Sequence, residues 1–131
     1  MTSRPTIADY MAREVAALLP EMEINQAVAI LLEKGYSGAP VVDGARRLVG
    51  VLSMKDCLSA ALNASYFQEW GGTVADYMST SVETLDADLD IVQAAERFLN
   101  SRFRRFPVMS EGRLVGQVSR VDLLRALAEQ W

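Results

Sequence analysis

The sequence predicts a mixed α/β fold of the α+β type, made of two β-α-β-β-α repeats packed sheet to sheet about a pseudo-twofold axis. Three observations predict it: the chain duplicates itself, each copy alternates apolar runs with an amphipathic stretch, and half of the 131 residues are hydrophobic. One copy of about 60 residues would struggle to bury both faces of a small sheet alone. Two copies that share one core would bury them, and would leave two related clefts between the repeats.

The duplication keeps its register along most of the chain. Similar segments occupy equivalent places in the two copies: 7–11 (IADYM) with 74–78 (VADYM), and 47–50 (RLVG) with 113–116 (RLVG). Equivalent residues are 67 apart in the first pair and 66 apart in the second, so the second copy lacks one loop residue. We therefore delimit the repeats as residues 1–66 and 67–131, which together form one compact module.

Each copy predicts the same elements in the same order. A short helical turn and a short extended piece come first, at 7–11 and 15–18 and again at 74–78 and 82–85. An amphipathic helix follows, because apolar residues recur at i, i+3, i+4, i+7 and i+8 from Ile24 and from Ile91. Gly35 is typical of the end of a helix.

Two short apolar strands follow each amphipathic helix, and a second helix closes each copy. The strands are expected at 39–42 and 48–52, and again at 106–109 and 114–118. The closing helices begin near Lys55 and Val121. The first continues into the early part of the linking segment 63–73, and Gly71-Gly72 then breaks the chain before the second repeat. Tyr66, Phe67 and Trp70 precede that interruption, and we interpret them as a cover for the core edge or a dimer contact, with base stacking as the alternative.

The composition argues against several classes of function. The chain has no histidine and only one cysteine, Cys57, so we expect neither a metal site nor a catalytic cysteine. No phosphate-binding glycine loop is present, and we expect no enzymatic activity. The net charge of −4 argues against a nucleic-acid partner. No apolar run approaches the roughly 20 residues that span a bilayer, and no signal peptide is evident, so we expect a cytoplasmic protein with no membrane partner.

Two segments carry a family resemblance: YSGAPVVDGARRLVGVLSMKD at 36–56 and FRRFPVMSEGRLVGQVSRVD at 103–122. Each joins a strand entry that ends in hydrophobic-Pro-Val, a Gly-containing hairpin, and Ser-x-x-Asp at the start of the last helix. The chain thus resembles the CBS-domain family, as a stand-alone tandem pair of the Bateman type. The resemblance implies a non-catalytic regulatory module that binds an adenosine compound, namely AMP, ADP, ATP or, in some members, S-adenosylmethionine. It also implies a homodimer that regulates an unknown protein on a separate chain.

The resemblance implies two binding sites, each joining the Ser-x-x-Asp of one repeat to the strand start of the other. In the family the Asp holds the ribose hydroxyls, the Ser lies near ribose or phosphate, and the adenine lies against the strand start and its proline. Carried over, the first site comprises Ser53, Asp56, Val82, Phe103, Arg104, Arg105 and Pro107. The second comprises Ser119, Asp122, Val15, Tyr36, Ser37 and Pro40.

The same residues allow other interpretations. Ser followed three residues later by Asp is also a capping box, which starts a helix without any ligand. The arginines at 102–105 are either solvated or hold phosphate, which would make the first site the better one for a polyphosphate. Glu83 lies close to the expected adenine of that site, where a carboxylate would disfavour a nearby phosphate.

The closing helices favour a homodimer, because they carry more apolar surface than one pair of repeats can hide. The residues expected on these exposed faces are Leu58, Ala61, Leu62, Leu123, Leu124 and Leu127. The alternative to nucleotide sensing is therefore a ligand-free dimerisation or protein-interaction module.

Overall fold

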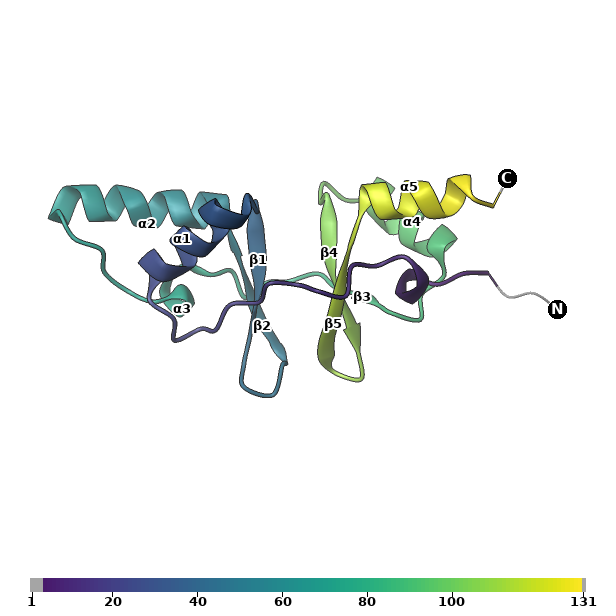
Figure 1. Ribbon diagram of the computed structural model, residues 1–131, viewed down its shortest axis with the longest axis horizontal. Helices are drawn as coiled ribbons and strands as arrows, with labels where there is room; N and C mark the ends of the chain where they lie inside the picture. The colour runs from purple at the N-terminus through teal and green to yellow at the C-terminus, as the bar shows by residue number, and fades with distance from the viewer. Residues whose placement is uncertain (1–3, 131) are drawn as a thin grey trace. The chain divides into compact units, whose positions relative to one another are not determined.

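The structure is a computed structural model that describes residues 4–130, and these form two compact units (Figure 1). The continuous stretch Ala16–Val82 makes up one, here called the central unit. The residues up to Val15 and those from Glu83 onward make up the other, here called the terminal unit. Both mix helices with strands, which confirms the predicted fold class.

The central unit follows the predicted order. It contains α1 (Ile24–Lys34), β1 (Gly38–Val42), β2 (Leu48–Ser53), α2 (Met54–Phe67) and α3 (Val74–Tyr77). β1 and β2 pair antiparallel, and Gly35 ends α1 in the left-handed conformation with φ +67°. The extended piece expected at 15–18 forms only an isolated parallel bridge, between Leu18 and Val41.

The terminal unit repeats this arrangement. It contains the short 3-10 helix η1 (Ile7–Asp9), β3 (Leu85–Asp86), α4 (Ile91–Leu99), β4 (Arg105–Ser110), β5 (Arg113–Ser119) and α5 (Arg120–Ala128). β3 pairs parallel with β4, and β4 pairs antiparallel with β5. The hairpin between β4 and β5 is the shorter one, and Glu111 and Gly112 turn it with positive φ angles.

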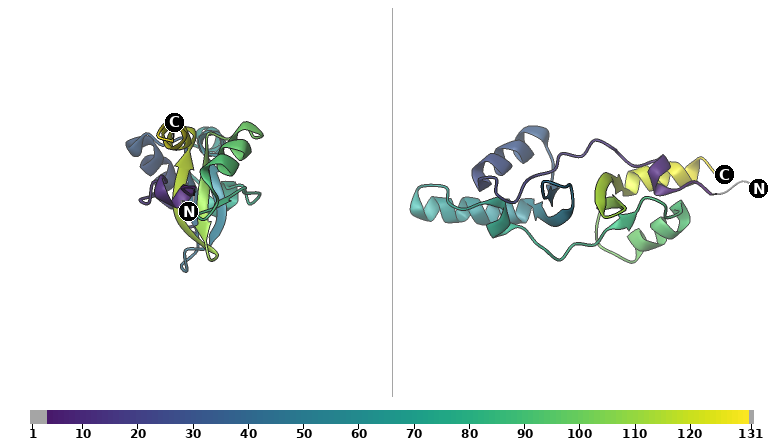
Figure 2. Two further views of the ribbon diagram at one scale, coloured as in Figure 1. Left: turned by 90° about the vertical axis from the view of Figure 1, so that its right-hand side faces the viewer. Right: turned by 90° about the horizontal axis from the view of Figure 1, so that it is seen from below.

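The two compact units do not coincide with the two sequence repeats, because the first segment of each repeat packs in the unit that the other repeat mainly forms. Ala12 bridges Gln117 of β5, whereas Ser79 bridges Val51 of β2. Figure 2 shows the consequence for the N-terminal segment (purple), which lies beside α5 (yellow). We call residues 5–12 and 72–79 the exchanged segments.

Equivalent hydrogen bonds hold both exchanged segments. The Ile7 N–H donates to the Leu89 carbonyl at 2.9 Å, and the Val74 N–H donates to the Met22 carbonyl at the same distance. Each segment also accepts a bond from the helix that it covers: the Ile91 N–H donates to the Pro5 carbonyl, and the Ile24 N–H to the Gly72 carbonyl. These partners keep the 67-residue spacing of the duplication, so each exchanged segment binds the same structural position.

Two equivalent glycines allow the exchanged segments to approach the sheets closely. A Cβ on Gly50 would lie 2.7 Å from the Met78 sulfur and 2.8 Å from the Ser79 carbonyl oxygen. A Cβ on Gly116 would meet the Met11 sulfur and the Ala12 carbonyl oxygen, both at 2.7 Å. Real Cβ atoms essentially never come this close to such atoms, so the glycine of each RLVG motif is required by the exchange.

Each unit has its own hydrophobic core. The central core gathers around α1, β1 and β2, and includes Leu18, Ile24, Leu31, Val41, Leu52, Cys57 and Val74. The terminal core includes Ile7, Met11, Leu85, Ile91, Phe98, Phe106, Val108, Val118 and Leu123. Ile7 and Val74 come from the exchanged segments, so the exchange contributes core as well as hydrogen bonds.

Two expectations about exposed apolar residues change. Leu123 was expected on an exposed face, but only 3% of it is exposed, because it occupies the core position that Cys57 fills in the other unit. Leu58, Leu62 and Leu124 are exposed as predicted, whereas Ala61 and Leu127 are half-buried. Tyr66, Phe67 and Trp70 are all exposed, so they do not cover the core edge.

Candidate functional site

The two Ser-x-x-Asp motifs lie where the sequence places them, at the first turns of α2 and α5. The Ser53 hydroxyl accepts the Asp56 N–H at 3.1 Å. In return, Asp56 Oδ2 accepts the Ser53 N–H and the Ser53 hydroxyl, both at 2.9 Å. This is a complete capping box, so the capping interpretation is confirmed.

Ser119 and Asp122 form the equivalent box at α5. Asp122 Oδ2 accepts the Ser119 N–H at 2.8 Å, and the Ser119 hydroxyl accepts the Asp122 N–H at 3.2 Å. The two boxes differ at the second carboxylate oxygen. Asp122 Oδ1 lies 3.7 Å from an Arg125 guanidinium nitrogen, whereas Asp56 Oδ1 has no partner within residues 4–130.

Each helix start is joined to the strand start of its own unit. The first N–H of α2, from Met54, donates to the Ser37 carbonyl at 3.0 Å, and Gly38 lies opposite Ser53 in the sheet. In the terminal unit the Arg120 N–H donates to the Arg104 carbonyl at 3.1 Å, and Arg105 lies opposite Ser119. The unit that holds Asp122 therefore presents arginines beside its helix start, and the unit that holds Asp56 presents Ser37 and a glycine.

The arginine run is exposed and unneutralised. Arg102, Arg104 and Arg105 are exposed, and none of them forms an ion pair with any residue from 4 to 130. Phe103 lies among them with 41% of its surface exposed. Its ring packs edge-on against the buried Phe106 ring, and the two ring centroids are 5.4 Å apart. An exposed aromatic ring among unpaired guanidinium groups offers one surface for a base and another for an anion.

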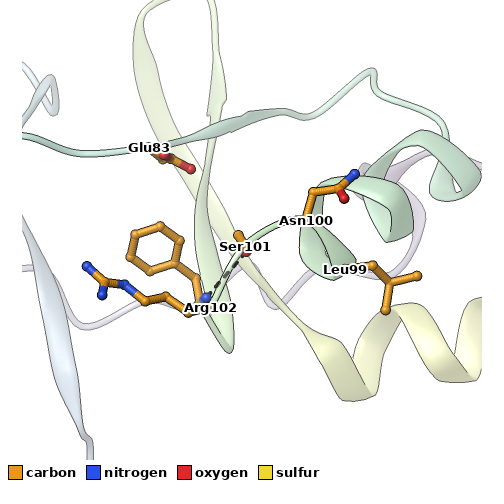
Figure 3. A pocket seen from close by; sticks show the side chains of 6 residues that line it. Glu83, Leu99, Asn100, Ser101 and Arg102 are labelled. Atoms are coloured by element: carbon orange, nitrogen blue, oxygen red, sulfur yellow. Dashed lines mark hydrogen bonds between the residues drawn. The ribbon is translucent and has the colours of Figure 1, made fainter.

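An open hollow of about 550 Å³ lies beside this run in the terminal unit (Figure 3). It is lined by Glu83, Leu99, Asn100, Ser101, Arg102 and Phe103. The Ser101 hydroxyl accepts the Phe103 N–H at 3.3 Å, which bends the chain from the end of α4 toward β4. The volume falls within the range of small-molecule sites, roughly 300–1,000 Å³.

The structure places the predicted site residues in two groups. The central unit holds Ser53, Asp56, Val82, Tyr36, Ser37 and Pro40, and the terminal unit holds Ser119, Asp122, Val15, Phe103, Arg104, Arg105 and Pro107. The predicted sites each combine residues of both units, and that combination stays a prediction. The sequence did not predict Leu99, Asn100 and Ser101 as lining residues, because their residue types do not indicate a hollow at the end of α4.

A model of the CBS domain matches residues 7–63 and 74–129, which covers both repeats and most of the chain. The chain belongs to the CBS-domain family. The resemblance drawn from the two Ser-x-x-Asp segments is thereby confirmed. The match also leaves out the residues around Gly71-Gly72, where the sequence predicts an interruption.

A solved structure and a curated protein resemble most of this chain. The crystal structure of Arabidopsis thaliana CBSX2 in complex with AMP has a TM-score of 0.81 and 30% sequence identity, and the match covers 96% of this chain and 98% of that one. The uncharacterized protein MJ1225 of Methanocaldococcus jannaschii is 28% identical over 125 residues, which are 95% of this chain and 44% of that protein.

An enzyme also matches most of this chain over a small part of its own length. The inosine-5'-monophosphate dehydrogenase of Korarchaeum cryptofilum is 30% identical over 116 residues, which are 87% of this chain but 22% of the enzyme. The chain thus spans less than half the length of both MJ1225 and this enzyme. Within the described residues, no helix combines the length and apolar character needed to cross a membrane.

Proposed function

We propose that this CBS pair is a non-catalytic regulatory module that binds an adenine nucleotide and acts on a separate protein. CBSX2, which has been crystallised with AMP, supports the proposal because it shares 30% of its sequence with this chain over nearly its whole length. AMP, ADP and ATP share an adenine and a ribose, so all three are candidate ligands. S-adenosylmethionine contains the same two groups and belongs in the same screen.

The observation that carries the proposal is that only one of the two carboxylate oxygens of Asp56 accepts hydrogen bonds within residues 4–130. Oδ2 makes both capping bonds, and Oδ1 has no partner within residues 4–130. A carboxylate oxygen accepts hydrogen bonds from hydroxyl groups, and the vicinal ribose hydroxyls are such donors. Capping and ribose binding therefore use different oxygens of Asp56, so the helix keeps its cap when a nucleotide binds.

Asp122 is the weaker candidate for a ribose. Its Oδ1 already lies 3.7 Å from Arg125, a partner that a ribose hydroxyl would have to share or replace. We therefore propose that the principal site combines Ser53 and Asp56 with Val82, Phe103, Arg104, Arg105 and Pro107, the residues of the first predicted site. In this proposal Phe103 contacts the adenine, and Arg104 and Arg105 bind phosphate oxygens.

Replacement of Asp56 by alanine tests this site against a purely structural role. A charged hydrogen bond contributes about 1.5–3 kcal/mol, so Asp56→Ala should weaken AMP and ATP by a similar factor, on the order of 10- to 100-fold in calorimetric titration. Loss of the cap should also lower the free energy of unfolding by about 1 kcal/mol.

Asp76→Ala is the matched control. Asp76 forms the same capping box with Thr73, through bonds of 2.8 Å and 3.2 Å to its Oδ2, and has no proposed ligand contact. It should lower the free energy of unfolding by a similar amount and leave AMP affinity unchanged. If Asp56→Ala binds AMP as the unaltered protein does, Asp56 is only a cap and the proposed site is wrong.

We also propose that the chain forms a homodimer through its closing helices. Leu58 on α2 and Leu124 on α5 are 66 residues apart, occupy equivalent positions, and are 71% and 69% exposed. Leu62 and Val121 extend the apolar face on their respective helices. This face is also what favours the alternative function, a dimerisation module without ligand. A melting temperature unmoved by AMP, ADP, ATP and S-adenosylmethionine would favour that alternative.

We place the module in the cytoplasm. Cys57 is a free, buried cysteine. Burial raises the pKa of its thiol, and the neighbouring Asp56 carboxylate raises it further, so the thiol stays protonated and unreactive at neutral pH. A single protonated thiol suits a reducing compartment.

A further inference from the structure

The hollow of the terminal unit carries one charge of each sign. Glu83 lies at one wall, on the chain that leads into β3, and Arg102 lies on the loop that joins α4 to β4 (Figure 3). The other lining residues, Leu99, Asn100, Ser101 and Phe103, are neutral. When both charged groups are ionised, the hollow has no net charge, although it adjoins a run of unpaired arginines.

We propose that Glu83 weakens the binding of nucleotides with additional phosphates, and thereby shifts the preference of this chain from ATP toward AMP. The inference rests on the proposed function, because it requires an adenine nucleotide whose phosphates lie by the arginine run that begins at Arg102. Glu83 is a specificity-determining residue in this proposal. Its carboxylate repels each added phosphate and opposes the attraction of the arginines.

The hollow is small enough that any occupant lies within the electrostatic range of the Glu83 carboxylate. A volume of 550 Å³ corresponds to a width of about 10 Å, close to the Debye length of about 8 Å in physiological salt. Neither Glu83 nor Arg102 forms an ion pair with any residue in the described range 4–130. A phosphate beside this arginine run therefore experiences the field of a carboxylate that forms no ion pair within residues 4–130.

The expected discrimination follows from the added charge. ATP carries about two more negative charges than AMP at neutral pH. Across several ångströms of mostly aqueous surroundings, each unit of repulsion changes an equilibrium constant by about two- to threefold. Glu83 should therefore disfavour ATP relative to AMP by about 3- to 10-fold.

Glu83 is a feature of one repeat and not of the fold. Its equivalent in the first repeat, 67 residues earlier, is Ala16, and the equivalent of Arg102 is Gly35. Glu83 is also exposed and belongs to neither hydrophobic core. Its charge can thus be removed without disturbing the packing of the terminal unit.

The test compares AMP, ATP and adenosine by calorimetric titration, without Mg²⁺, in the unaltered chain and in Glu83→Gln. The variant should gain about 3- to 10-fold more affinity for ATP than for AMP, and adenosine affinity should not change. The gain should shrink at high salt, because the repulsion is screened. Glu111→Gln is the matched control, since it removes the same charge from the turn at the far end of β4 and should leave the ATP-to-AMP ratio unaltered.

Three outcomes would overturn the inference: equal changes for AMP and ATP, no change for either, or the same shift in Glu111→Gln. A loss of adenosine binding in Glu83→Gln would overturn it as well, because Glu83 would then contact the nucleoside and not oppose phosphate. If the unaltered chain binds none of the three compounds, the proposed function itself fails. That result differs from all the others, because they require at least one measurable affinity.

Discussion

The Tyr10 phenol donates a hydrogen bond of 2.7 Å to the Glu129 carboxylate, and thereby ties an exchanged segment to the residue that follows α5. The equivalent tyrosine, Tyr77, accepts a bond of 3.2 Å from the Asn63 amide of α2. Tyr10 and Tyr77 are 67 residues apart, and Asn63 and Glu129 are 66 apart, so the duplication has kept the contact and changed its chemistry. The Tyr10 contact includes the charged Glu129 carboxylate, whereas the Tyr77 contact joins two neutral groups.

The Tyr10 contact should weaken in strong alkali. The hydrogen bond to Glu129 raises the pKa of Tyr10 above its ordinary value of 10.0, and desolvation and the charge of Glu129 raise it further. A raised folded-state pKa contributes stability that is complete below the unfolded pKa and is lost as the pH rises through the folded one. Tyr10→Phe should therefore be less stable than the unaltered chain at pH 8 in urea denaturation. The difference should shrink above pH 10, and a constant difference would contradict the assignment.

The two close-approach glycines should be intolerant of alanine. In Gly50→Ala and Gly116→Ala the new Cβ would meet backbone oxygen at 2.8 Å and 2.7 Å, so the exchanged segment must shift. We expect each variant to lose about 1–3 kcal/mol of unfolding free energy in denaturant titration. Gly44→Ala is the control, because a Cβ there meets no atom within 4 Å and should change stability by less than about 0.5 kcal/mol.

The exchange of segments predicts which fragments fold. A fragment of residues 16–82 contains a whole compact unit, including the exchanged segment that bridges β2. A fragment of residues 1–66 is a whole sequence repeat but lacks Val74 of the central core and the Ser79 bridge. We expect a cooperative thermal transition by circular dichroism for 16–82 and none for 1–66. Cooperative unfolding of 1–66 alone would show that the exchanged segment is dispensable.

Removal of the arginines that we propose to bind phosphate should have the opposite effect to removal of Glu83. Replacing Arg104 and Arg105 together by glutamine should weaken ATP more than AMP, because each added phosphate loses a cationic partner. The difference between the two nucleotides should shrink at high salt. Replacing Arg46 and Arg47, which are adjacent arginines beside the β1–β2 turn, removes the same charge elsewhere and serves as the control. An equal loss of ATP and AMP affinity would mean that the pair does not hold phosphates.

Light scattering at micromolar concentration should return twice the chain mass of 14.4 kDa. A charge placed on either equivalent leucine of the closing helices, as in Leu58→Glu or Leu124→Glu, should shift the mass toward the monomer. Leu99→Glu is the control, because Leu99 is even more exposed but lies on α4. A monomer in the unaltered chain would rule out the dimer, and dissociation by Leu99→Glu as well would place the contact elsewhere.

The order of the helices and strands could be predicted from the sequence because local periodicity encodes it. The helical spacing from Ile24 and Ile91, the glycine at 35 and the two Ser-x-x-Asp caps all act over fewer than about ten residues, and each lies where it was expected. The duplication made these signals stronger, since every element was predicted twice. The resemblance to CBS domains followed from the same short motifs, and the family match bears it out.

Tertiary structure alone decided how those elements combine. No local signal shows that Ile7 packs in the unit of Leu123, or that Leu123 and not Leu124 turns inward, because α5 carries apolar residues on its buried face and on its exposed face. The hollow beside Phe103 is equally hidden, since it depends on where the chain before β3 passes the end of α4. Periodicity specifies which residues are buried, whereas the pairing of distant segments specifies which core they join. That pairing depends on contacts between residues far apart in the chain, such as Val51 with Ser79 and Ala12 with Gln117.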